Sequence, residues 1–328
     1  MHGRVDGKDE RKGRHAHKEH REHVRHVVVA PVVIWCIVGS FGATLLLVSV
    51  LNIASLLEYR RNIGEGLLAR LSGGAMARGV HASGLAAWHP ACVASNEALL
   101  PVLGALSLLG TARGGAAFAA SMCGCLLLLL QAHILRAGSG KGFGTQGAQA
   151  RTASGVTPLA MVSLLLDALG LVYVGGGYGF LLLQRGKPST RAMAQTLSFC
   201  LCVWNTDNGA LFAGRTLGRR PLIPAVSSGK TVEGALGGVA LSVATAAACP
   251  HLFPATWLAP PNRSCVGPLT LGLLVGLAAV CGDLVLSFMK RAAGIKDSGR
   301  FFPGHGGCLD RMDSFLLAGP VVYFLTHD

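Results

Sequence analysis

The chain has 328 residues, of which 51% are hydrophobic and 14% are charged. The apolar residues form long uninterrupted runs, which exclude a soluble globular protein and predict an all-α, polytopic transmembrane protein. The net charge of +13 is interpreted as loop orientation and contact with anionic membrane lipids. A nucleic-acid partner is not expected, because no basic patch is interleaved with aromatic residues.

Residues 1–26 are polar and basic and contain six histidines. We interpret them as a solvated cytoplasmic tail, because such low-complexity ends lack the apolar residues that a folded core needs. A metal-binding tail is the alternative, since four histidines would share one face of a helix: His17, His20, His23 and His26.

Eight apolar runs follow the tail, and most have the ~20 residues that a helix needs to cross the hydrocarbon core. They lie roughly at 27–57, 80–110, 116–135, 156–183, 194–213, 235–258, 269–289 and 314–326. A hairpin turning at Gly39 to Gly42 would divide the first run into two. We therefore predict eight or nine membrane spans.

Basic residues predict which loops face the cytoplasm. The loops at 215–230 and 290–311 are rich in Lys and Arg, whereas the loop between them carries only Arg263. The positive-inside rule therefore places both basic loops in the cytoplasm, together with the loop that begins near residue 60. The basic loop at 185–191 falls outside in this scheme and does not follow the rule.

Glycine pairs spaced four residues apart predict close helix packing in the second half of the chain. Gly234 with Gly238, and Gly272 with Gly276, have the small-xxx-small spacing. The GGGYG sequence at 175–179 follows no strand, so it predicts a loosened or terminated membrane helix and not a phosphate loop. The ten cysteines are interpreted as small buried hydrophobic residues.

The first polar segment, residues 204–238, places an acid, several basic residues and hydroxyl groups at the ends of two apolar runs. We interpret it as an anion site, with Asp207, Ser227, Lys230 and Thr231 as its candidate binding residues. The SSGKT sequence within it is not a Walker motif, because the preceding glycine is absent and no strand leads in.

The second polar segment, residues 282–314, holds nine charged side chains beside an apolar run. They are Asp283, Asp297, Asp310, Asp313, Lys290, Arg291, Lys296, Arg300 and Arg311. Ionised groups at a membrane are costly unless they pair, hold a ligand or face a polar cavity. These residues are therefore functional candidates.

Spacing within the second polar segment predicts a metal site. Asp283, Ser287 and Lys290 lie at i, i+4 and i+7, so they share one face of a helix. Asp310 and Asp313, three residues apart at the start of the next helix, suit a hard cation such as Mg²⁺. The alternatives are an internal ion pair between Asp283 and Lys290, and a simple helix cap.

A loop with glycine and proline, residues 303–307, separates these two helices, and its small residues let backbone amides approach an anion. Carboxylates for a divalent metal, with cations for phosphates, predict phosphoryl or nucleotidyl transfer to a lipid. We therefore divide the rest of the chain into residues 27–193, the N-terminal and middle helices, and residues 194–328, the catalytic transmembrane region.

The sequence from Ser287 to Ser314 resembles the C-terminal signature of the phosphatidate cytidylyltransferase family, also called CDP-diacylglycerol synthases. DNGALFAGRTLGRR followed by SSGKTVEG resembles two earlier elements of that family, Asp-x-x-Ala-Tyr-x-x-Gly-Arg and Ser-Pro-x-Lys-Thr-x-Glu-Gly. LLEYRR, ending at Arg61, resembles its Glu-aromatic pair. Leu211 and Ser228 depart from the pattern, where the family has Tyr and Pro.

The resemblance implies that CTP and phosphatidate react to give CDP-diacylglycerol and pyrophosphate. It also implies Mg²⁺, with a second monovalent or divalent cation as a further candidate, and a homodimer. We expect a bacterial inner membrane with the active site facing the cytoplasm. The implied metal ligands are Asp283, Asp310 and Asp313. The other implied catalytic and substrate-binding residues are Lys290, Arg311, Asp207, Ser227, Lys230, Thr231, Ser287, Arg291, Lys296, Asp297, His305, Gly306 and Gly307.

Two other functions fit parts of the pattern. A CTP-dependent polyprenol or phytol kinase uses similar cytidine chemistry but releases CDP. A transporter or channel would also carry acids inside membrane helices, and Asp167 is placed like such a residue. We interpret Asp167 instead as a paired structural group, because the other charges lie at helix ends on one side and the two halves show no repeat.

Overall fold

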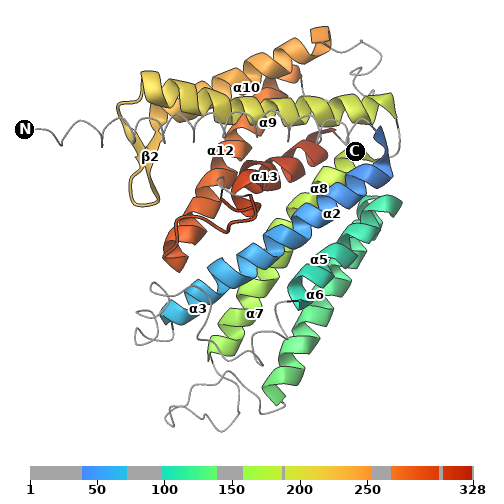
Figure 1. The fold of residues 1–328 in the computed structure, drawn as a ribbon. Helices are drawn as coiled ribbons and strands as arrows, with labels where there is room; N and C mark the ends of the chain where they lie inside the picture. Colours follow the sequence, from blue (N-terminus) through green and yellow to red (C-terminus); the bar gives the residue numbers. More distant parts are fainter. Residues whose placement is uncertain are drawn as a thin grey trace, which may run out of the picture.

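The computed structural model of the chain describes residues 39–71, 98–138, 158–186, 189–252, 267–302 and 306–326. These residues are predominantly helical, and long helices pack side by side or cross obliquely (Figure 1). The first group of elements is α2 (Phe41–Glu58), η1 (Tyr59–Gly64), α3 (Glu65–Leu71), α5 (Leu99–Leu109), η2 (Gly110–Arg113), α6 (Gly115–Gly138), α7 (Pro158–Gly170), η3 (Leu171–Gly175) and α8 (Gly176–Arg185). The second group is α9 (Thr190–Thr216), β1 (Pro221–Ile223), β2 (Ser227–Thr231), α10 (Val232–Leu252), α12 (Pro268–Ala293) and α13 (Leu309–Thr326).

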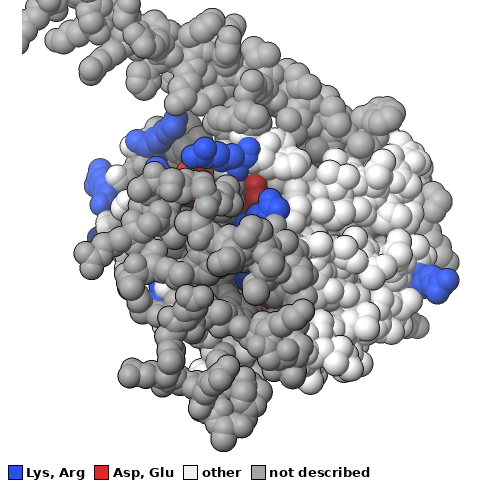
Figure 2. All heavy atoms as spheres, turned by 60° about the horizontal axis from the view of Figure 1, so that its bottom comes forward, with Lys and Arg blue, Asp and Glu red and all other residues white. Residues whose placement is uncertain are grey.

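The protein is a helical membrane protein. Among the described residues, five helices are long and apolar enough to cross a bilayer: Phe41–Leu71, Gly115–Leu135, Pro158–Arg185, Val232–Leu252 and Pro268–Ala293. Their outward side chains include large apolar residues that lipid tails would cover, for example Leu46, Leu127 and Leu236. Figure 2 shows a broad uncharged surface beside a group of basic and acidic side chains gathered toward one side of the molecule.

The prediction of eight or nine spans stays a prediction. The helix α9 is continuous but carries the polar run from Asn205 to Asn208, and α13 carries three charged residues in its 18. Neither helix is among the five candidate spans. Residues 1–38 lie outside the described residues, and so does the predicted tail. The structure places the start of α2 at Phe41, where the Ser40 side chain accepts a hydrogen bond from the Ala43 amide.

Two of the long helices are continuous through a π-helical turn. The first runs from α2 through η1 to Leu71, so the predicted loop beginning near residue 60 is wrong. The charge of Arg60 does not end the helix, because its guanidinium is buried in an ion pair. The second runs from Pro158 to Arg185 with its π-helical turn at Leu171–Gly175, which agrees with a helix loosened near the GGGYG sequence.

A buried ion cluster joins the first helices to one another. The Arg60 Nε lies 3.0 Å from Asp167 Oδ1, and the His133 Nε2 lies 3.0 Å from Asp167 Oδ2. The side chains of Arg60 and Asp167 are only 5% and 4% exposed. Asp167 is therefore paired, as the structural interpretation predicts.

Replacing Arg60 with Met should destabilise the protein by roughly 3 kcal/mol, because it removes the guanidinium partner of a buried carboxylate. The double variant Arg60→Met with Asp167→Leu should recover part of this loss, since no buried acid then remains. Thermal unfolding in detergent would measure both effects. An unchanged melting temperature in the single variant would contradict a structural role for the pair.

Close helix contacts in the second group depend on glycine. A Cβ at Gly238 would lie 2.6 Å from the Thr206 carbonyl oxygen of α9, and one at Gly272 would lie 2.8 Å from Val243 Cα of α10. The predicted small-residue packing is therefore confirmed for these helices, and α10 packs against both α9 and α12. This packing brings the polar ends of α9, α10 and α12 together.

The expectation of a purely helical chain is incomplete, because β1 and β2 form a two-stranded antiparallel hairpin before α10 (Figure 1). Pro221 is paired with Thr231, and Ile223 with Ser227. The SSGKT sequence is the second strand itself and not a loop between a strand and a helix, so it has no Walker geometry. The hairpin carries Lys230 toward α12.

Candidate active site

The two polar segments of the sequence meet through Lys230. Its ammonium forms an ion pair with the Asp283 carboxylate and lies 3.4 Å from Ser287 Oγ. The Ser287 hydroxyl in turn lies 3.5 Å from Asp283 Oδ1, as the shared helix face predicts. The side chains of Lys230 and Asp283 are 26% and 34% exposed, so both remain accessible to a ligand. The alternative ion pair between Asp283 and Lys290 is not what the structure shows.

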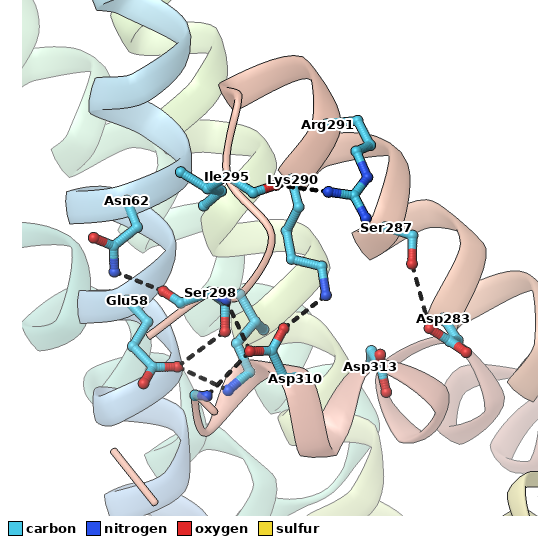
Figure 3. A network of polar contacts seen from close by, with 12 residues as sticks. Glu58, Asn62, Asp283, Ser287, Lys290, Arg291, Ile295, Ser298, Asp310 and Asp313 are labelled. Atoms are coloured by element: carbon cyan, nitrogen blue, oxygen red, sulfur yellow. Dashed lines mark hydrogen bonds and ion pairs between the residues drawn. The ribbon is translucent and has the colours of Figure 1, made fainter. Parts of the chain in front are cut away.

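Lys290 turns instead toward the start of α13. Its ammonium lies 2.8 Å from Asp310 Oδ1, while Asp310 Oδ2 accepts hydrogen bonds from the backbone amides of Ser298 and Gly307 (Figure 3). Burial alone would raise the pKa of Asp310. The hydrogen bond and charge of Lys290 and the two amides outweigh it, so that pKa lies below its ordinary value. Asp310 is thus a fully engaged anion.

Three acids from three helices gather beside this pair. Asp313 of α13 lies near Asp283 of α12 (Figure 3), and Asp207 of α9 is linked to the same turn of α13 through Ser314. The Ser314 hydroxyl donates to Asp207 Oδ1 at 3.1 Å, and the Ser314 amide donates to Asp313 Oδ1 at 2.8 Å. We call Asp207, Asp283 and Asp313 the acidic cluster. The sequence analysis predicted Asp207 as a substrate-binding residue and did not predict that it lies near Asp283 and Asp313.

The acidic cluster suits a cation whose remaining coordination positions are filled by substrate oxygens. Within the described ranges, no three His, Cys, Asp or Glu side chains converge as a ready-made metal cage. Mg²⁺ commonly takes only one or two carboxylates and fills its remaining positions with water and substrate phosphates. Asp283 and Asp313 supply such a pair of oxygen donors. Asp310 fits less well, because its oxygens already accept from Lys290 and two amides.

Several predicted binding residues have structural partners. Arg291 donates from Nε to the Val226 carbonyl and from Nη1 to the Ile295 carbonyl, which ties the hairpin to the end of α12. Thr231 Oγ1 accepts from the Gly234 amide at 3.1 Å and so caps α10. Ser227 lies at the start of β2.

The remaining predicted residues lie around the loop between α12 and α13. Lys296 and Asp297 are exposed just after α12, and the charge of Arg311 acts on Asp207. Gly306 has a φ of +84°, a left-handed conformation that favours glycine, and Gly307 donates its amide to Asp310. His305 lies outside the described residues.

Comparison with known proteins places this arrangement in a family. A model of the cytidylyltransferase family matches residues 22–327. The chain belongs to the cytidylyltransferase family. This cytidylyltransferase-family chain is 44% identical over 137 residues to a phosphatidate cytidylyltransferase of Synechocystis, covering 42% of the chain and 44% of the relative. It is 43% identical over 126 residues to the enzyme of the same name in Bacillus subtilis, covering 38% and 45%.

An uncharacterized Escherichia coli protein, YnbB, is 34% identical over 193 residues, covering 52% of the chain and 62% of the relative. The chain thus spans about half the length of the first two relatives and under two thirds of the third.

Sequence reasoning about this cytidylyltransferase-family chain did not place two residues, Glu58 and Asn62, at the site. Glu58 of α2 accepts from the Leu309 amide at 3.0 Å and from Ser298 Oγ at 3.3 Å. Asn62 of η1 donates to the Ser298 carbonyl at 2.6 Å (Figure 3). The signal for Glu58 was an acid inside an apolar helix, within the LLEYRR sequence, but its partners lie more than 200 residues away.

Proposed function

We propose that the chain is a phosphatidate cytidylyltransferase that converts CTP and phosphatidate into CDP-diacylglycerol and pyrophosphate. The observation that carries this proposal is the meeting of the acidic cluster with Lys230 and Arg311 at the polar ends of membrane helices. Such a site combines metal ligands and phosphate-binding cations next to lipid. The names of the Synechocystis and Bacillus subtilis relatives support the same substrates.

In the proposed reaction, an oxygen of the phosphatidate phosphate attacks the α-phosphorus of CTP. The new P–O bond forms as the bond between the α-phosphorus and its bridging oxygen breaks, and the bond electrons leave with pyrophosphate. The phosphatidate oxygen is already ionised at neutral pH, so no strong base in the protein is required. Lys230, Lys290 and Arg311 would balance the negative charge of the triphosphate.

We propose Asp283 and Asp313 as the ligands of a divalent cation, with Mg²⁺ as the first candidate. When bound, such a cation supplies charge stabilisation for the phosphates. Asp207 would lie beside it, through its hydrogen bond with Ser314. Asp310 would hold the Lys290 ammonium through one oxygen. Through the other oxygen it would accept the Gly307 amide and so keep the loop in place at the edge of the site. Ser227 and Ser287 would contact phosphate oxygens.

We also propose a location and an assembly. The basic ends of α9 and α12 favour a site that faces the cytoplasm, by the positive-inside rule. The bacterial relatives favour the inner membrane. A homodimer is proposed from the family resemblance, and an eight- or nine-span topology from the apolar runs of the sequence.

The reaction is tested by following label from CTP. The purified protein in detergent, supplied with phosphatidate and Mg²⁺, should transfer label from the α-phosphate of CTP into lipid and release labelled pyrophosphate from the β and γ positions. Removing Mg²⁺ with a chelator should stop the transfer. Release of CDP with γ-label in the lipid would instead identify a lipid kinase. Ion flux in liposomes without lipid turnover would identify a transporter.

A further inference from the structure

The segment from Ile295 to Leu309 joins α12 to α13 and carries the glycines beside Asp310. Two carboxylates each accept hydrogen bonds from both the beginning and the end of this segment. Asp310 accepts the amides of Ser298 and Gly307, and Glu58 accepts the Ser298 hydroxyl and the Leu309 amide (Figure 3). Asp310 belongs to the site itself. Glu58 comes from α2, at the opposite end of the sequence.

Glu58 is an unusual group to place inside the protein. It is 8% exposed, and its Oε1 is buried without a hydrogen-bond partner. The structure records no ion pair for it within the described part of the chain. Burying a carboxylate without a cation is costly, so its position is held by the surrounding fold. The groups that hold it are the two donors from the segment between α12 and α13.

The backbone of the segment is shaped to this carboxylate. A Cβ at Gly299 would collide with Glu58 Oε1, and a Cβ at Gly307 would collide with Glu58 Oε2 and with Ser298 Oγ. A Cβ at either position would displace the end of the Glu58 side chain or the segment from the present contact. The two glycines therefore allow the close approach between the segment and Glu58.

Ser298 connects Glu58 to Asp310 of the candidate site. Its hydroxyl donates to Glu58, its amide donates to Asp310 Oδ2, and its carbonyl accepts from Asn62. Asp310 then holds the Lys290 ammonium through its other oxygen. Glu58 is thus connected to Lys290 through two intervening residues, without itself reaching the acidic cluster.

We propose that Glu58 is a positioning residue for the catalytic site, an inference that rests on the proposed function. It sets the place of Ser298 and of the first turn of α13, and through them the orientation of Asp310 and Lys290. It does not touch the substrate. Loss of Glu58 lets the segment shift, and a misplacement of about 1 Å at a reacting group costs on the order of 10²-fold in rate.

The test measures activity and the position of the segment separately. Glu58→Ala should lower kcat by about 10²-fold with a smaller change in KM for CTP. Glu58→Gln keeps an oxygen that accepts hydrogen bonds from both donors, so it should recover a large part of that loss.

Cys308 can report on the position of the segment, because it is 0% exposed and lies beside Leu309, with its thiol 3.4 Å from Ser55 Oγ.

Alkylation of Cys308 by N-ethylmaleimide, read by mass spectrometry of the peptide, should be several-fold faster in Glu58→Ala than in the wild type and in Glu58→Gln. Glu58→Gln lacks the same charge, so the comparison with it separates movement of the segment from the effect of the Glu58 charge on the thiol. The matched control is Asp167→Asn, which changes a buried acid of α7 whose recorded partners are Arg60 and His133 and no described residue of the segment. It should lower the melting temperature but leave the rate of Cys308 alkylation at the wild-type value.

The outcomes separate this inference from the proposed function. Wild-type Cys308 alkylation together with wild-type kcat in Glu58→Ala would overturn the positioning role. If Glu58→Ala does not fold, the same comparison is made with Ser298→Ala, which keeps the Glu58 carboxylate and removes one of its two donors. A wild-type kcat together with wild-type alkylation of Cys308 in Ser298→Ala would then overturn the positioning role. A wild-type protein that transfers no label from CTP contradicts the reaction only, because the Cys308 measurement needs no turnover.

Discussion

The Asp283→Asn variant should lose at least about 10³-fold of its cytidylyl transfer, because charge stabilisation by a metal site is worth several kcal/mol. Asp283 is the residue where the Lys230 ion pair, the Ser287 hydroxyl and the acidic cluster meet. Asparagine keeps the size and one oxygen of the side chain but removes the charge. Label transfer from CTP into lipid would measure the loss.

The stability of Asp283→Asn should change little. Both members of its ion pair are at least a quarter exposed, and such pairs contribute about 1 kcal/mol or less. Asp167→Asn is the matched control, since it makes the same replacement in a membrane helix away from the site. It should be less stable but active when folded. An Asp283→Asn protein with more than a tenth of the wild-type rate would contradict the assignment.

Asp310→Asn should lose both activity and stability. Its carboxylate is 11% exposed and the paired Lys290 side chain is 13% exposed. Replacing the carboxylate leaves a largely buried ammonium without its partner, and removing one member of a buried pair costs about 3 kcal/mol. Two amide hydrogen bonds to a charged acceptor are weakened as well.

Lys290→Met distinguishes the two roles of this pair. It leaves Asp310 with its two amide donors, so the stability loss should be smaller than in Asp310→Asn. Activity should still fall strongly, because the proposed role of Lys290 is to balance the negative charge of the triphosphate. Melting temperature and kcat measured on the same preparations would compare the variants. A fully stable but inactive Asp310→Asn would show instead that this carboxylate meets the metal or substrate directly.

The helices could be predicted from the sequence because apolar runs long enough to cross a membrane are unambiguous. The error came at Arg60, where charge was read as the end of a span. Only the fold brings Asp167 and His133 to the guanidinium, so a buried arginine and a loop arginine look alike in the sequence. The hairpin was missed for a similar reason, since a five-residue strand without alternation has little signal of its own.

The members of the site were easier to predict than their partners. Charged residues beside apolar runs identified Lys230, Asp283 and Asp310. Helical spacing suggested that Asp310 and Asp313 face one ion, but they lie at the N-terminal end of α13 and have different neighbours. Asp310 is engaged by Lys290 and the segment before it, whereas Asp313 lies with Asp283. Contacts between distant segments decide such roles, and spacing does not contain them.

The hydrogen bonds from Glu58 and Asn62 to the segment before α13 bear on how the protein divides into parts. The metal-ligand candidates all lie beyond residue 194, so the chemistry has the outline of a separable C-terminal module. Such a module would not contain all of its own contacts, because Glu58 of α2 and Asn62 of η1 hydrogen-bond the segment between α12 and α13. If the proposed positioning role of Glu58 is correct, residues 194–328 expressed alone would lack part of the support for their own loop, because that support comes from α2 and η1.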